Sequence, residues 1–301
     1  MYNNTGQDKS QELLLNKLAV KKSYNNKVIK FLLDQGDYER AERVKYCGCN
    51  VGVTTVDNFA RFIKADFCRE RLCQVCAWRR QSRFVAQTIP ILSILNSKGY
   101  RFIMATLTIK NVCYEELENT IDILLRGYEL LRHRRKIKRS WLGIIRSLEL
   151  SYNSSDDTFH PHIHLLVCVP NTYFYNADMY ISTEELSRLW GESIGADYNV
   201  ICDIRTITED TTGAVEVLKY SLKPSKAQKP LLAFYEILRG RRLISFSGIF
   251  TKIRKDLKYS DFDSVLTDND LIPQGTSISY NLYRFDVTGG YYNFIERYNI
   301  I

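Results

Sequence analysis

The sequence predicts an α+β protein whose main sheet is antiparallel and carries helices on one face, with a cysteine-rich segment before it. From residue 99 to residue 228, strand-like and helix-like segments follow the order strand, helix, strand, strand, helix, strand, helix. Two of these strands are separated only by a short polar segment, which indicates an antiparallel hairpin. Five of the eight cysteines lie between Cys47 and Cys76, and this clustering defines the separate segment.

The composition is that of a folded, basic protein. Hydrophobic residues make up 45% and charged residues 25% of the 301 residues, which excludes general disorder. No apolar run approaches the roughly 20 residues that span a bilayer, and the N-terminus lacks the pattern of a secretory signal. We therefore expect a cytoplasmic protein with no membrane partner. The formal net charge of +8 favours a polyanion such as DNA.

Four regions are expected along the chain. Residues 1–40 form a helical extension, with a helix at 12–33 whose lysines we interpret as a solvated face in preference to a DNA contact. Residues 41–98 form the cysteine-rich subdomain, with a helix at 79–95 leading out of it. Residues 99–228 form the core and residues 229–301 a C-terminal extension of helix and strand. In the core we expect strands at 102–109, 143–152, 162–169 and 199–207, and helices at 115–131, 182–194 and 212–222.

The segment HPHIH provides half of a metal site. Alternate side chains of a strand share a face, so His162 and His164 point the same way, while Ile163 points into a core. If the two strands form a hairpin around 153–159, Glu149 falls opposite one of these histidines. Two imidazoles and a carboxylate suit Mg²⁺ or Mn²⁺, and they also suit Zn²⁺ or Fe²⁺.

A second candidate site lies on the helix expected at 212–222. Glu216, Lys219, Tyr220 and Lys223 share one helical stripe, separate from the apolar stripe that would dock on the sheet. A tyrosine beside two lysines is a candidate nucleophile. The alternatives are a rim tyrosine or a solvated face with an ion pair.

Several of these motifs, in this order, resemble those of HUH endonucleases. His162-Ile163-His164 with the apolar run after it is similar to the histidine motif of that family, and EVLKYSLK is similar to its nucleophile helix. The segments FIMATLTIKN, FCRERLCQVCAWRR and ISFSGIF resemble parts of one branch, the rolling-circle replication initiators of small bacterial plasmids.

The resemblance implies an HUH fold, which is a ferredoxin-like antiparallel sheet. It implies that His162, His164 and Glu149 hold the catalytic Mg²⁺ or Mn²⁺, that Tyr220 is the nucleophile, and that His160 is not a ligand. Glu216 matches the acid that this branch carries in place of a second tyrosine. The implied activity is nicking and strand transfer at the plasmid origin through a 5′-phosphotyrosine, on a single-stranded or hairpin nick site. Host helicase and polymerase are the implied partners.

The cysteine-rich segment predicts a structural zinc site. Cys68, Cys73 and Cys76 lie within nine residues, and a tetrahedral Zn²⁺ needs one more thiolate. Cys47 and Cys49 are both candidates, and the resemblance favours Cys47. Buried free cysteines are the alternative interpretation. The basic residues beside the last cysteine are candidates for a phosphate-contacting, DNA-binding patch: Arg79, Arg80 and Arg83.

Two other functions remain open from the sequence. An HUH transposase or relaxase would use the same chemistry, although relaxases place the tyrosine before the histidine motif. A non-catalytic zinc-containing DNA-binding regulator would explain the cysteines and the charge. It would not explain why Glu149, His162, His164 and Tyr220 occur together.

Overall fold

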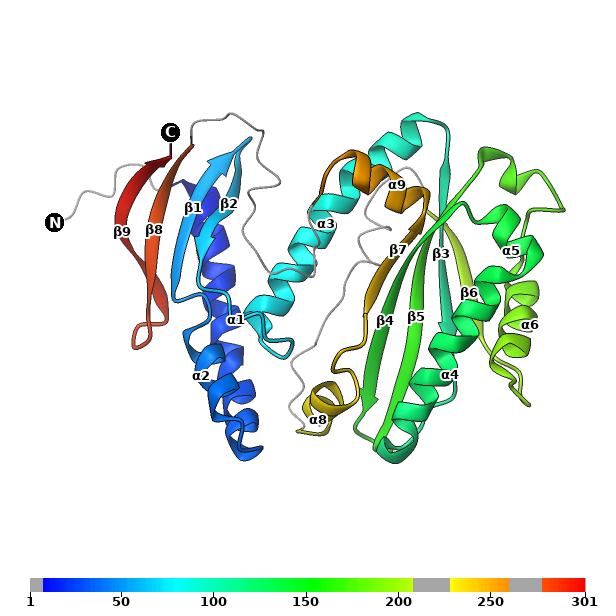
Figure 1. Cartoon of the computed structure of the whole chain (residues 1–301), viewed down its shortest axis with the longest axis horizontal. Helices are drawn as coiled ribbons and strands as arrows, with labels where there is room; N and C mark the ends of the chain where they lie inside the picture. Colours follow the sequence, from blue (N-terminus) through cyan, green and yellow to red (C-terminus); the bar gives the residue numbers. More distant parts are fainter. Residues whose placement is uncertain (1–7, 208–227, 260–277, 301) are drawn as a thin grey trace. The chain divides into compact units, whose positions relative to one another are not determined.

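The computed structural model describes residues 8–207, 228–259 and 278–300, which form two compact units (Figure 1). The first unit includes residues 8–84 and 278–300, and the second includes residues 85–207 and 232–258. The chain therefore leaves the first unit and returns to it at the C-terminus. In the described ranges, no helix has the length and apolar character needed to cross a membrane.

The first unit is built on a four-stranded antiparallel sheet with the order β2-β1-β8-β9. Its strands are β1 (Asn50–Val56), β2 (Phe59–Ala65), β8 (Ile278–Asp286) and β9 (Tyr291–Ile300). Asp57 and Asn58 both have positive φ, as a two-residue hairpin turn between β1 and β2 requires. The central pairing joins β1 to β8, with Val51 opposite Tyr283. The sheet thus depends on residues from both ends of the chain.

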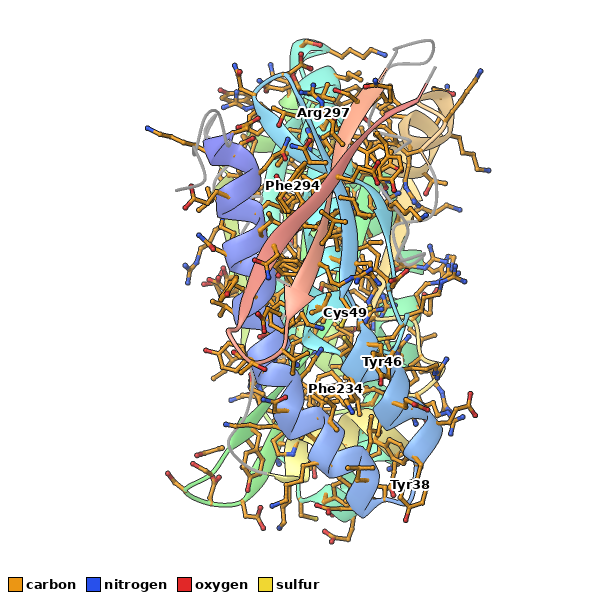
Figure 2. The ribbon with its side chains drawn as sticks, turned by 90° about the vertical axis from the view of Figure 1, so that its left-hand side faces the viewer. Tyr38, Tyr46, Cys49, Phe234, Phe294 and Arg297 are labelled. Carbon is orange, nitrogen blue, oxygen red and sulfur yellow. The ribbon has the colours of Figure 1, made fainter. Side chains whose placement is uncertain are left out.

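Helix α1 (Lys9–Asp34) packs on this sheet and is followed by α2 (Tyr38–Tyr46). The Asp8 carboxylate caps α1 by accepting a hydrogen bond from the Ser10 amide at 2.8 Å. Inside the unit, Gln11 donates to Thr55 Oγ1 at 3.1 Å and accepts from the Tyr283 hydroxyl at 3.0 Å. One buried glutamine therefore ties α1 to two strands. Figure 2 shows Tyr38 and Tyr46 at the two ends of α2, and both are exposed.

The second unit contains a five-stranded antiparallel sheet with the order β6-β3-β5-β4-β7. The chain enters it through α3 (Gln74–Ser97), and α8 (Gln228–Glu236) crosses into it before β7. Its strands are β3 (Arg101–Thr108), β4 (Gly143–Asn153), β5 (Thr158–Val169), β6 (Cys202–Ile207) and β7 (Ile244–Gly248). Its other helices are α4 (Tyr114–His133), α5 (Arg135–Ser140), α6 (Thr183–Ile194), α9 (Ile249–Asp256) and the 3-10 turn η1 (Asn171–Phe174).

Helices α4 and α6 contact the sheet on one face (Figure 1). Leu107, Leu148 and Ile163 point to this face and are at most 1% exposed. Helix α9 differs from the expectation of helices on one face only, because Phe250 stacks on Phe102 across one end of the opposite face. The rest of that opposite face carries the polar residues described below.

The prediction of an α+β class with antiparallel sheets is confirmed. The expected hairpin forms. Strand β5 begins at Thr158, earlier than the expected start at residue 162, and His160 and Pro161 therefore also pair with β4. Ser182 caps α6 as expected by accepting from the Glu185 amide at 3.2 Å. The C-terminal region expected at 229–301 is divided, since β7 and α9 join the second unit while β8 and β9 join the first. The helix expected at 212–222 lies outside the described residues.

The close approach of α4 and α6 predicts a stability effect at Gly127. A Cβ atom there would overlap Ile194 Cγ2 and come within 3.2 Å of Trp190 Cζ3. Overpacking costs about 1–3 kcal/mol and the helical preference of alanine returns up to about 1 kcal/mol, so Gly127→Ala is expected to lower the free energy of unfolding by about 1–2 kcal/mol. Urea denaturation followed by circular dichroism measures this change.

The matched control is Gly191→Ala on α6. A Cβ at this position meets only Val200 Cγ2 at 3.4 Å, an ordinary contact. Because alanine also favours a helix over glycine by up to about 1 kcal/mol, this variant should be as stable as the parent or more stable. Equal stability of the two variants would contradict the proposed packing constraint.

Candidate functional site

The two strands of the β4–β5 hairpin bring one carboxylate and two imidazoles together. Glu149 pairs directly with His162, and His164 lies two residues further along β5 on the same face. Glu149 Oε2 is 3.6 Å from His162 Nε2 and 3.1 Å from His164 Nε2. One atom from each of the three residues can be chosen so that all lie within 4.8 Å of one another. This is a group that could hold a metal ion.

Both imidazoles are oriented through their second nitrogen. His164 Nδ1 hydrogen-bonds Thr106 Oγ1 on β3 at 3.2 Å. His162 Nδ1 lies 3.1 Å from the backbone oxygen of His160. These contacts fix the ring orientations and leave both Nε2 atoms directed at Glu149, as in metal sites whose histidines are held by neighbouring groups.

Glu149 is ionised at neutral pH in this environment. Partial burial would raise the pKa of Glu149, but its interactions with His162 and His164 outweigh burial and lower the pKa to about 2. An ionised carboxylate with two fixed imidazoles is a donor set that binds divalent cations. The residues present therefore fit the metal that the sequence predicts, although the donor set alone does not select among Mg²⁺, Mn²⁺, Zn²⁺ and Fe²⁺.

His160 lies beside this group but outside it. Its ring stacks on that of His162, with centroids 5.0 Å apart, and it pairs with Ser151 of β4. Burial and the electrostatic effect of the neighbouring His162 ring lower the pKa of His160. His160 therefore packs against the His162 ring and is not a member of the group.

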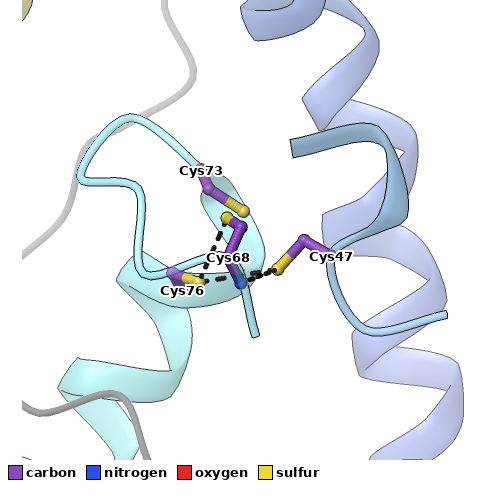
Figure 3. A group of neighbouring side chains, drawn as sticks. All are labelled: Cys47, Cys68, Cys73 and Cys76. Carbon is purple, nitrogen blue, oxygen red and sulfur yellow. Dashed lines mark hydrogen bonds between the residues drawn. The ribbon is translucent and has the colours of Figure 1, made fainter. Parts of the chain in front are cut away.

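A second group of four thiols lies in the first unit (Figure 3). Cys68 precedes α3, Cys73 and Cys76 lie at its start, and Cys47 follows α2. The Cys76 thiol is 3.5 Å from that of Cys47 and 3.6 Å from that of Cys68, and all four sulfur atoms lie within 4.8 Å of one another. Four converging thiols, three of them buried, match the donor set of a tetrahedral metal site.

The close packing of these thiols shifts their pKa values in opposite directions. Hydrogen bonds with the neighbouring thiols and burial raise the pKa of Cys47, whereas the pKa of Cys73 is lowered because its thiol hydrogen bonds outweigh burial. A bound cation would let all four ionise together.

Of the two candidates for the fourth thiol, the structure groups Cys47 with the others and leaves Cys49 outside. Cys49 Sγ lies 3.3 Å from Lys22 Nζ, and Lys22 also donates to the Cys47 carbonyl at 2.7 Å. Cys49 lines a cavity of about 690 Å³ between α1, α2 and the β8–β9 turn. It is therefore a neighbour of the cluster and not a member of it.

Sequence reasoning missed the contribution of α1 to this cluster. The buried Asn25 donates to Cys73 Sγ at 3.2 Å and accepts from the Gln74 amide at 2.8 Å. The only available signal was a polar residue on the apolar stripe of the helix. Thr106 was missed in the same way, because its partner His164 lies on another strand.

The expected phosphate-contacting patch requires a correction. Arg79 and Arg80 are 4% and 8% exposed. The Arg79 guanidinium lies over the Phe62 ring at 5.2 Å, and Arg80 donates to the carbonyl of Arg71 at 3.2 Å. These groups support the cysteine segment from inside the unit, so they do not display a basic surface. Arg83 follows one helical turn after them on α3, at the end of the first unit.

The four residues expected to surround the nucleophile lie outside the described residues, and they remain predictions: Glu216, Lys219, Tyr220 and Lys223.

Comparison with known proteins identifies the family. A family model described as "Replication protein" matches residues 59–292. "Protein rep" of Streptococcus pneumoniae is 37% identical over 254 residues, which cover 79% of each chain. "Protein rep" of Bacillus amyloliquefaciens is 32% identical over 74% of each chain, and "Protein rep" of Lactiplantibacillus plantarum is 27% identical over 76% of this chain and 78% of that one. No solved structure matches significantly. The chain belongs to the replication-protein (Rep) family.

Proposed function

We propose that this protein initiates rolling-circle replication of a plasmid by nicking one strand of the origin DNA and transferring it through a tyrosine. The observation that carries the proposal is the convergence of Glu149, His162 and His164 on one face of an antiparallel sheet, in a chain of the replication-protein family. A zinc-containing DNA-binding regulator would not need this second group of ligands. The ferredoxin-like HUH topology is part of the same proposal.

The residues that would hold the catalytic cation are Glu149, His162 and His164. When bound, Mg²⁺ or Mn²⁺ would supply charge neutralisation on a phosphodiester oxygen. Glu149 contributes the negative charge, since its pKa of about 2 keeps it ionised. Thr106 and the His160 carbonyl act as positioning groups for the two imidazoles.

The proposed nucleophile is Tyr220. Its phenolate oxygen would attack the phosphorus and the P–O3′ bond would break. The departing 3′ oxygen would take a proton from water and become a 3′-hydroxyl for a host polymerase. The strand would remain joined as a 5′-phosphotyrosine, which conserves the bond energy for rejoining. Lys219 and Lys223 would favour the phenolate, because nearby positive charge lowers the pKa of a phenol.

For the cysteine cluster we propose a structural zinc ion held by Cys47, Cys68, Cys73 and Cys76. All four positions would be filled by thiolates, so no position is left for a substrate, as in structural zinc sites. Three N–H groups donate to its sulfur atoms: the Cys68 amide to Cys47, the Glu70 amide to Cys68 and the Asn25 side chain to Cys73. Such donors stabilise thiolate charge.

The first test of the function is covalent capture of DNA. With Mn²⁺ and a labelled single-stranded oligonucleotide that carries the nick site, the parent protein should form an adduct that survives a denaturing gel. Tyr220→Phe removes only the attacking oxygen, so the adduct should disappear while origin binding is retained.

Two controls accompany this experiment. EDTA should abolish the adduct, and so should His164→Ala, because that variant loses one of three ligands. Adduct formation by Tyr220→Phe would reject the nucleophile, and full activity in EDTA would reject metal-assisted nicking.

Glu216 is expected to serve the terminating cleavage and not the first one. It lies four residues before Tyr220, and as a general base it would activate a water for the second cut. Glu216→Ala should therefore still form the adduct but should release multimeric single-stranded product in a replication assay. Gel analysis of product length measures this, and Glu216→Tyr, which restores a second nucleophile, is the matched variant. Unit-length product from Glu216→Ala would show that the residue only forms a surface ion pair.

The zinc proposal predicts about one zinc per chain by elemental analysis, retained in mild EDTA. Cys73→Ser should lose the metal and destabilise the first unit, since structural zinc contributes directly to folding. Cys113→Ser, at an exposed position outside the cluster, is the control and should keep both metal and stability. Four freely titratable thiols in a zinc-free native protein would overturn the assignment.

A further inference from the structure

The exposed face of α1 is rich in positive charge that the described part of the chain does not neutralise. The helix carries six lysines and two acidic residues, Glu12 and Asp34. Lys22 is buried on the inner face, whereas Lys9, Lys17, Lys27 and Lys30 are exposed: these four make no ion pair with any described residue. At 1.5 Å per residue, the 26-residue helix extends about 39 Å.

The same face carries apolar and small polar side chains between the lysines. Leu13 is 57% exposed, Val20 53% and Tyr24 38%. Asn16 and Ser23 are exposed on the stripe that joins them. Amide, hydroxyl and apolar groups between lysines are the types of side chain that contact base edges and thymine methyls in a major groove.

The inner face of α1 holds the helix rigidly in place. Gln11 joins it to β1 and β8, Lys22 to the Cys47 carbonyl and Asn25 to Cys73. The exposed stripe is therefore presented on a fixed scaffold, which reduces the entropy lost on binding. Figure 2 shows α1 in blue, beside and below the red strands β8 and β9.

The helix also lies outside the segment that the family model matches, which begins at residue 59. The residues proposed for the chemistry all lie inside that segment. A surface that selects one replicon's DNA is expected outside the part that carries the shared chemistry. The position of α1 in the sequence agrees with a role in recognition.

We propose that the exposed stripe of α1 binds duplex DNA by lying in the major groove, with its lysines on the phosphates. The inference rests on the proposed function, which supplies origin DNA as the partner. A second copy of the chain fits the stripe less well. Its exposed apolar positions are only Leu13, Val20 and Tyr24, and paired copies would place lysines near lysines.

The test measures binding to a labelled duplex that contains the nick site, by fluorescence anisotropy over a range of salt concentrations. The variant Lys17→Ala/Lys27→Ala/Lys30→Ala should bind at least tenfold more weakly. Its slope of log affinity against log salt should fall by about 2 to 3, since each lost phosphate contact removes about 0.9. Lys98→Ala, at an exposed lysine of the second unit, is the control and should bind as the parent does.

A second variant tests the position of the DNA and does not depend on removing lysines. Ser23→Glu places a carboxylate in the middle of the stripe and should weaken duplex binding by a similar factor. Circular dichroism should show both variants folded, because every changed side chain is exposed.

Parental affinity and salt slope in both variants would overturn the proposal, and so would a parental dimer that the variants lose while still binding DNA. The adduct formed by the parent protein on single-stranded DNA is measured in parallel. Its absence would count against the proposed nicking, whereas its presence with unchanged duplex binding would reject the role of α1 alone.

Discussion

The register between β4 and β5 is the constraint on which the candidate metal site depends. Because side chains alternate along a strand, a shift of one residue would move Glu149 to the face opposite His162 and His164.

Two features fix the register between β4 and β5. Leu148 and Ile163, one position away, are fully buried on the face that α4 covers. In the turn, the Asn153 side chain accepts from the Ser155 amide at 3.1 Å, and Asp157 takes positive φ. The same alternation that builds the core therefore builds the site.

The first unit has a comparable centre in its cysteine cluster. The cluster joins the end of α2 to the start of α3, and α1 contacts it through Lys22 and Asn25. An ion pair supports the loop between Cys68 and Cys73, since the half-buried Arg40 of α2 donates to both oxygens of the buried Glu70 at 2.7 Å. Removing Arg40 would leave the buried Glu70 carboxylate with the more distant Arg43, at 3.9 Å, and would destabilise the loop. Polar and sulfur contacts around the cluster thus help to position three helices, α1, α2 and α3.

Local sequence patterns correctly predicted the features that depend only on neighbouring residues. The β4–β5 hairpin, the Ser182 cap and the grouping of Glu149 with two histidines follow from alternation, short loops and capping chemistry. The first sheet could not be predicted, because β1 pairs with β8 some 230 residues later in the sequence. No turn or spacing signals such a pairing, and its entropic cost is recovered only in the folded core.

The sequence also did not show which basic side chains are buried and which are exposed. Arg79 and Arg80 were expected on a DNA-binding surface, and the helix lysines were interpreted as a solvated face. The arginines are buried because a guanidinium can lie over an aromatic ring and donate to carbonyls within a packed unit. Of the α1 lysines, only Lys22 is buried, where it makes three hydrogen bonds, two to backbone carbonyls and one to the Cys49 thiol. Lys9, Lys17, Lys27 and Lys30 are exposed to water, where strongly hydrated point charges are stable and remain available to a polyanion. The number of basic residues in a segment therefore says little about DNA contact until packing shows which of them remain exposed.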